Sequence, residues 1–118
     1  METPGEDSRT GVGTPTEEGV GPVVLRVHRV RNEVVVAACD ADLVDTFLMV
    51  GKSRVPVSAQ FYGRRRVSRE EFLRAVRLGT IVNLLGTETV AMAVAEGLLD
   101  AGAVGTLGGI PHAEIVQM

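Results

Sequence analysis

The sequence predicts an α+β domain, with a mostly antiparallel sheet of four to five strands and about three helices packed on one face. Three observations support this class. Alternating apolar residues over 23–30 are followed at once by a second apolar run over 33–39, which is typical of a hairpin. Ser68 and Glu71 open an amphipathic segment with the spacing of a helix start. Strand-like runs then return near the end of the chain.

The predicted hairpin is the first folded feature of the chain. Residues 23–30 place apolar side chains on one face and a mixture of apolar and basic side chains on the other. Arg31 and Asn32 form a plausible tight turn, because asparagine tolerates a positive φ. Residues 33–39 are apolar on both faces, so we expect this strand to lie centrally in the sheet.

The middle of the chain is predicted to contain a short helix and then an extended segment. Asp40 or Asp42 can cap a helix over residues 41–50. Residues 52–63 read as extended, and Pro56 within them suits a strand at the edge of a sheet.

Two further helical segments are expected. The helix that begins after Ser68 ends at Gly79, where glycine is a common stop. Residues 80–85 are predicted to form a further apolar helical turn or two. Thr87 offers a cap for a last, largely buried helix over residues 88–100.

The chain closes with GGIPHAEIVQM. Gly108 and Gly109 permit positive φ angles, and Pro111 holds the residue before it in an extended conformation. We therefore expect a turn that presents His112 at the start of a final strand.

Composition restricts the organisation and the compartment of the protein. The chain has 118 residues, the length of one domain. Residues 1–21 hold five acidic residues, one arginine and almost no large apolar residue, so they are predicted to be a disordered acidic leader before a single globular domain over 22–118. One cysteine favours a reducing compartment, and no apolar run approaches the ~20 residues of a membrane span, so a cytoplasmic protein without membrane contact is expected. Eleven of the twelve basic residues are arginine, a bias that also fits a thermophile.

One set of candidate functional residues suggests a small enzyme or ligand-binding protein. Cys39, Asp40 and His112 are candidate catalytic residues, and Asn83 is a polar residue within an apolar run that can line the same cleft. The alternative is structural: a buried thiol, a helix cap, a ring bonded to its own turn and an amide that bridges two elements. Two histidines and one cysteine are too few for a closed zinc site, and no metal or other cofactor is predicted. The sequence leaves open whether the protein is an enzyme.

The preferred hypothesis from sequence is a small non-enzymatic module that contacts RNA or a ribonucleoprotein. An arginine run beside two aromatic residues suits phosphates and unstacked bases. The alternative is a solvated surface with aromatic residues in the core. The candidate binding residues are Phe61, Tyr62, Arg64, Arg65, Arg66, Asn83 and His112.

A third hypothesis concerns the final strand. AEIVQM can pair at a sheet edge with a partner protein or with a second copy, which makes the chain an interaction subunit or a homodimer.

Four stretches also carry a resemblance to a known family: VVVAACD, QFYGRRRVS, TIVNLLG and GGIPHAEIVQM, in this order and spacing. Together they resemble the archaeal family catalogued as domain of unknown function number 424, over roughly residues 23–118. The resemblance implies an archaeal cytoplasmic origin and a compact α+β fold, and it implies no particular activity. The chain departs from the family pattern at its arginine run, where a turn with glycine or an acid is usual, and at Glu114, where glutamine is common. The positions that match the family's recognisable residues are Cys39, Asp40, Phe61, Tyr62, Asn83, Gly86, Gly109, Pro111 and His112.

Overall fold

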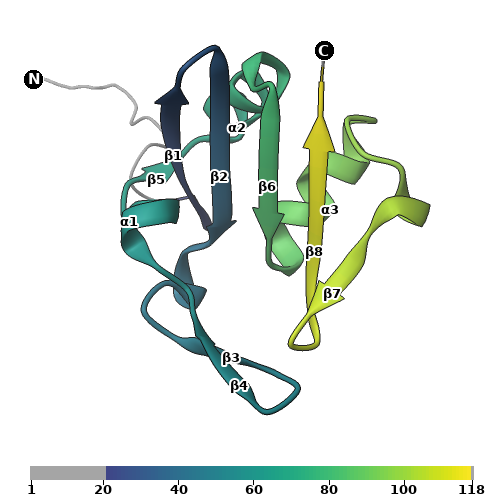
Figure 1. Cartoon of the computed structure of the whole chain (residues 1–118). Helices are drawn as coiled ribbons and strands as arrows, with labels where there is room; N and C mark the ends of the chain where they lie inside the picture. The colour runs from purple at the N-terminus through teal and green to yellow at the C-terminus, as the bar shows by residue number, and fades with distance from the viewer. Residues whose placement is uncertain (1–20, 118) are drawn as a thin grey trace, which may run out of the picture.

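The computed structural model describes residues 21–117 (Figure 1). They form a central sheet with one layer packed on each of its faces and a hairpin that projects from it. The predicted leader over 1–21 lies outside the described residues, except for Gly21. No helix within the described range is long and apolar enough to cross a membrane. In chain order the elements are β1 (Val23–Val30), β2 (Glu33–Asp40), η1 (Ala41–Leu43), β3 (Phe47–Val50), β4 (Ser53–Pro56), α1 (Ala59–Tyr62), β5 (Arg66–Val67), α2 (Arg69–Leu78), β6 (Ile81–Leu85), α3 (Thr87–Ala95), η2 (Ala101–Ala103), β7 (Gly105–Leu107) and β8 (Ile110–Val116).

The α+β class and the mainly antiparallel sheet are confirmed, whereas the strand number and the placement of the helices are corrected. The main sheet has six strands in the order β5-β1-β2-β6-β8-β7, not four to five. It is mixed, because β2 and β6 run parallel while the other neighbours are antiparallel. Helices α2 and α3 cover one face of the sheet, but α1 lies on the opposite face together with the hairpin of β3 and β4 (Figure 1).

The first hairpin forms as predicted, and its second strand is central. Strand β2 lies between β1 and β6, so both of its edges are hydrogen-bonded. In the turn it is Arg31, rather than the expected asparagine, that adopts a positive φ of 58°.

The helix predicted over residues 41–50 is wrong. The chain forms only the 3₁₀ turn η1 and then strand β3, which pairs with β4 to make a two-stranded arm over residues 47–56. Within β3, Leu48 is buried while Phe47 and Met49 are exposed, which is the alternation of a strand. Pro56 ends β4 at the edge of this arm, and the next four-residue helix, α1, was not predicted.

The helical turn predicted over residues 80–85 is also wrong, because this segment is the central strand β6. Val82 and Leu84 pack under the helices, while Leu85 packs on the opposite face. A strand that is covered on both faces reads as a continuous apolar run, and such a run cannot be told from a buried helix by its periodicity.

The helix-covered face holds the larger core. The predicted capping box starts α2, since the Ser68 hydroxyl accepts a hydrogen bond from the Glu71 amide at 3.1 Å. Phe72 and Val76 of α2 and Val90 of α3 are buried against the sheet.

The start of α3 is held by a residue that is distant in sequence. The expected cap was Thr87, but the Asp40 carboxylate at the end of β2 accepts hydrogen bonds from the Glu88 and Thr89 amides and from the Thr89 hydroxyl, at 2.8–3.2 Å. Gly86 makes this approach possible: its φ is 116°, and a Cβ there would lie 2.4 Å from the Asp40 carboxylate. The cap therefore ties β2, β6 and α3 together.

The chain ends in the predicted strand. Gly108 and Gly109 form a two-residue turn between β7 and β8 with φ angles of 58° and 80°, as the common two-residue hairpin turns require. Strand β8 lies between β6 and β7, so its outer edge is paired only over residues 110–112.

Replacing Asp40 with alanine is expected to destabilise the protein by about 1–2 kcal/mol, because three donors at the start of α3 lose their acceptor. Asp42 is exposed and is the matched control, so Asp42→Ala should change the urea midpoint little. Equal losses in the two variants would contradict a specific cap.

Candidate functional site

The face of the sheet opposite α2 and α3, here called the open face, is organised in three rows that cross four strands. Strand pairing places one residue from each of β1, β2, β6 and β8 in each row. The outer row is His28, Val35, Ile81 and Val116; the middle row is Arg26, Ala37, Asn83 and Glu114; the inner row is Val24, Cys39, Leu85 and His112.

Val24, Cys39 and Leu85 of the inner row and Ala37 of the middle row are buried, whereas His112 and the rest of the other two rows are partly open. Leu48 of the arm and Tyr62 of α1 pack on Cys39 and Leu85 in a second, smaller core. Glu114 and Val116 remain exposed, and Asn83 is half-buried. The open face therefore offers apolar and polar side chains to a ligand, next to the part of the face that is buried in the smaller core.

A polar cluster lies at the centre of the open face. The Tyr62 hydroxyl donates a hydrogen bond to Asn83 Oδ1 at 2.7 Å. This bond orients the amide so that Asn83 Nδ2 lies 3.4 Å from His112 Nε2 and 3.5 Å from Glu114 Oε2. Burial raises the pKa of Tyr62 to about 12, so its hydroxyl stays protonated and remains the donor at neutral pH.

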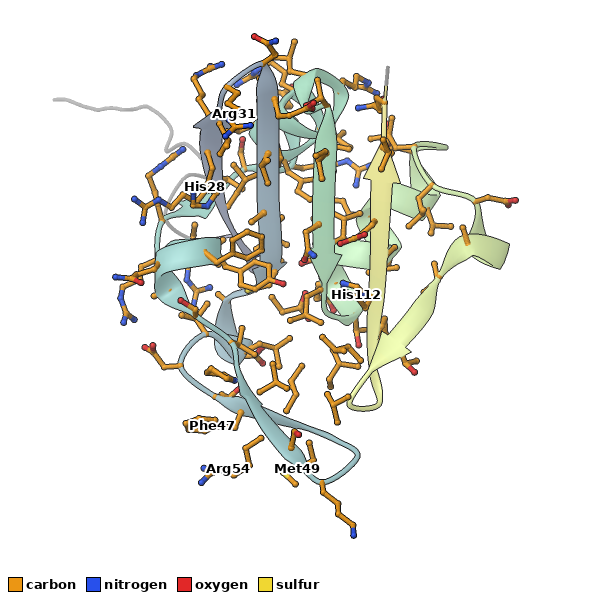
Figure 2. All side chains as sticks on the ribbon, viewed as in Figure 1. His28, Arg31, Phe47, Met49, Arg54 and His112 are labelled. Atoms are coloured by element: carbon orange, nitrogen blue, oxygen red, sulfur yellow. The ribbon has the colours of Figure 1, made fainter. Side chains whose placement is uncertain are left out.

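An aromatic pair lies at the β1 side of the open face. The His28 and Phe61 rings are stacked with centroids 5.4 Å apart, and the His28 Nε2 atom lies 2.7 Å from the Phe61 carbonyl oxygen. Because a carbonyl only accepts, Nε2 of His28 carries the proton in this bond. Figure 2 shows His28 and His112 on opposite sides of the face.

The predicted arginine run is largely engaged within the protein. Arg64 makes two hydrogen bonds to the Asp45 carboxylate, and Arg65 pairs with Glu71. Arg66 donates to the Gly21 carbonyl at 2.9 Å.

Other basic residues of the open face are available to a ligand. Among residues 21–117, Arg26 in the middle row and Arg31 at the hairpin turn are exposed and have no ion-pair partner.

The structure does not bring Cys39, Asp40, Asn83 and His112 into one cleft. Cys39 is separated from His112 by Leu85, and two strand spacings amount to roughly 10 Å. Asp40 binds the start of α3 instead. Of the four, only Asn83 and His112 meet, together with Tyr62.

Three further polar residues of the open face were not predicted as site residues from the sequence: Arg26, His28 and Glu114. Arg26 lies two residues from the buried Val24, Glu114 lies two residues from His112, and His28 continues the alternation of β1, so alternation is the signal that suggests them once the face is known. No group of three or more histidine, cysteine, aspartate or glutamate side chains in the described part of the chain is arranged to hold a metal.

Comparison with known proteins places these features in a family. A family model described as "Protein of unknown function (DUF424)" matches residues 28–118, which confirms the resemblance seen in the sequence. The fold is similar to that in the crystal structure of an uncharacterized conserved protein from Methanopyrus kandleri, with a TM-score of 0.71, 26% identity, and coverage of 81% of this chain and 93% of that one. No functionally curated protein matches the chain.

The Cys39 thiol is expected to be unreactive in the folded protein. Burial, followed by the nearby Asp40 and Asp42 charges, raises its pKa to about 12, and its side chain is 0% exposed. At pH 8 only about one thiol in ten thousand is ionised, and this fraction rises about tenfold per pH unit below that pKa. A thiol reagent should therefore label native protein very slowly at pH 8 and label it at once in urea. Rapid native labelling that is slowed by His112→Ala would restore the Cys–His hypothesis.

Proposed function

We propose, from the premise that the chain belongs to the DUF424 family of unknown function, that it is a non-enzymatic binding module. The module binds single-stranded RNA on its open face, and this RNA is either free or part of a ribonucleoprotein. The observation that carries the proposal is the open face itself: stacked rings, an oriented amide and arginines without an ion-pair partner among residues 21–117 lie on the partly covered side of the sheet.

The chemistry of this face suits unpaired bases. Proteins that read single-stranded RNA stack bases on aromatic rings and bond the base edges with polar side chains. His28 and Phe61 are each half-buried and form a stacked pair, and Asn83 and His112 supply polar groups further across the face. Duplex RNA offers mainly its backbone and minor groove, and it does not reach these groups in the same way.

The charges support phosphate contacts at the β1 side. Arg26 and Arg31 have no ion-pair partner among residues 21–117 and are exposed to a phosphate, whereas Arg64 is already bonded to Asp45. The arm adds Lys52 and Arg54, and the Arg54 guanidinium lies 4.2 Å from the centre of the Phe47 ring (Figure 2). These cations surround the open face on two sides.

The chemistry of the described residues gives less support to the enzyme hypothesis. A buried thiol with a raised pKa is a poor nucleophile, and Asp40 already caps a helix. The convergence of Asn83, His112 and Glu114 does favour a second candidate, the binding of a small polar ligand at the same site.

Removing the free arginines is expected to weaken RNA binding in a salt-dependent way. In fluorescence anisotropy with a short mixed-sequence RNA, the double variant Arg26→Ala/Arg31→Ala should lose affinity, because each lost phosphate contact lowers the slope of log K against log salt by about 1. Titrations between about 50 and 200 mM salt measure this slope.

Arg64→Ala is the matched control, since it removes one arginine that is already paired with Asp45. It should change affinity and slope much less than the double variant, with melting temperatures that show all proteins folded. RNA binding that is absent, or that ignores both salt and the two free arginines, would contradict the proposal.

A further inference from the structure

We propose that Asn83 and Glu114 of the middle row recognise the Watson–Crick edge of a guanine base, so that the RNA bound by this chain is selected for an unpaired guanine. This inference rests on the proposed function and specifies its ligand.

The two side chains present a fixed order of donor and acceptor. Because Asn83 Oδ1 accepts the Tyr62 hydroxyl, the amide presents its NH₂ group as the donor. The contacts of this NH₂ group to His112 Nε2 at 3.4 Å and to Glu114 Oε2 at 3.5 Å lie at the long limit of hydrogen bonding, so a base acceptor can replace them. Beside it, at 3.5 Å from Asn83 Nδ2, lies the exposed Glu114 carboxylate, which only accepts when ionised. The site therefore offers one donor followed by two carboxylate oxygens.

Guanine is the base whose edge complements this order. Its O6 atom accepts, and its N1–H and N2–H₂ groups are two adjacent donors that a carboxylate can accept together. Adenine and cytosine each present one amino donor at the end of this edge, followed by the acceptor N1 in adenine or the acceptors N3 and O2 in cytosine, and uracil presents one N3–H donor between two carbonyl acceptors. For those bases one carboxylate oxygen would face a lone pair instead of an N–H group, and this mismatch costs binding energy.

The neighbouring outer row supplies an apolar surface for the base. Ile81 is half-buried and Val116 is 69% exposed, and both lie two residues along the strand from Asn83 and Glu114, about 7 Å away. A planar base that bonds the middle row by its edge can lie across these side chains and cover apolar surface that is otherwise exposed to water.

The distance between Arg26 and Glu114 makes a carboxylate compatible with a face that binds RNA. Three strand spacings, roughly 14 Å, separate Arg26 and Glu114 at the two ends of the middle row. They do not neutralise each other at that distance. Arg26 remains free for the backbone, while Glu114 is placed away from the phosphates and next to the amide with which it reads a base.

The test uses the full chain and a set of fluorescent oligouridines that carry one central guanine, inosine, adenine, cytosine or uracil. Wild-type protein should prefer guanine over adenine, cytosine and uracil by about 5- to 100-fold, as for a good bidentate contact to a base edge. Inosine lacks the N2 amino group, so it should bind with intermediate affinity. Glu114→Gln should bind guanine and inosine equally while keeping its affinity for the all-uridine RNA.

Glu70→Gln is the matched control, because it also removes one exposed negative charge, but from α2 on the far side of the sheet. It should retain the full guanine preference. Equal affinity for all five RNAs with wild-type protein would overturn the inference and leave the proposed function standing.

Calorimetric titration with guanosine monophosphate separates the remaining cases. If the mononucleotide binds and Glu114→Gln abolishes that binding, while none of the RNAs binds, the guanine site stands and the RNA function fails. If neither the mononucleotide nor any RNA binds, both the proposed function and this inference fail.

Discussion

Strand β6 pairs with β2 in parallel and with β8 in the antiparallel direction. These two pairings fix the positions of the polar residues of the candidate site and of the start of α3. They set Asn83 beside Ala37 on one side and Glu114 on the other, which creates the middle row. They also carry Gly86 at the end of β6 to the carboxylate of Asp40, so that the helix following β6 begins at a preformed acceptor. A slip of one residue along β6 would turn Asn83 toward the helices and bring Leu84 to the open face.

The two faces of the sheet differ in how far they are covered and in what they contribute. Helices α2 and α3 bury most of one face, although Val27 of β1 remains 41% exposed there, and they supply most of the hydrophobic stabilisation. On the other face, α1 and the arm bury Val24, Cys39 and Leu85 of the inner row and Ala37 of the middle row, and the hydrogen bond from Tyr62 to Asn83 lies at the edge of this cover. A single bond of this kind contributes roughly 1 kcal/mol to stability, but it decides which end of the amide points outward. The partial cover thus both stabilises the fold and leaves oriented polar groups in the open.

The local features of the fold were predictable from sequence, and the long-range ones were not. The hairpin followed from alternation, and the start of α2 followed from Ser68 and Glu71, because these signals operate over a few residues. The strand character of β6 was missed, since burial on both faces removes the alternation on which the prediction depends. The arm was missed for a different reason: only Leu48 in β3 is buried, so the apolar run there does not reflect a helical stripe.

The candidate site shows the same division. Asn83 stood out as a polar residue within an apolar run, and His112 as a residue that follows a rigid turn. Their contact with each other and with Glu114 depends on the pairing of β6 with β8, which brings Asn83 next to residues 29 and 31 positions later in the sequence. Likewise, the arginine run was predicted to contact RNA, whereas the pairing of Arg64 with Asp45, which is 19 positions away in sequence, arises only through the fold.

The central claim is that ligand contacts concentrate on the middle row. A two-dimensional ¹⁵N NMR titration of the full chain with a short guanine-containing RNA measures this most directly. We expect shifts in the Asn83 side-chain amide, in the backbone amides of Arg26 and Glu114 in the middle row and in that of the neighbouring His112, with little change in α2 and α3. Shifts confined to residues 64–66 or to the helix layer would contradict it, as would a spectrum that RNA leaves unchanged.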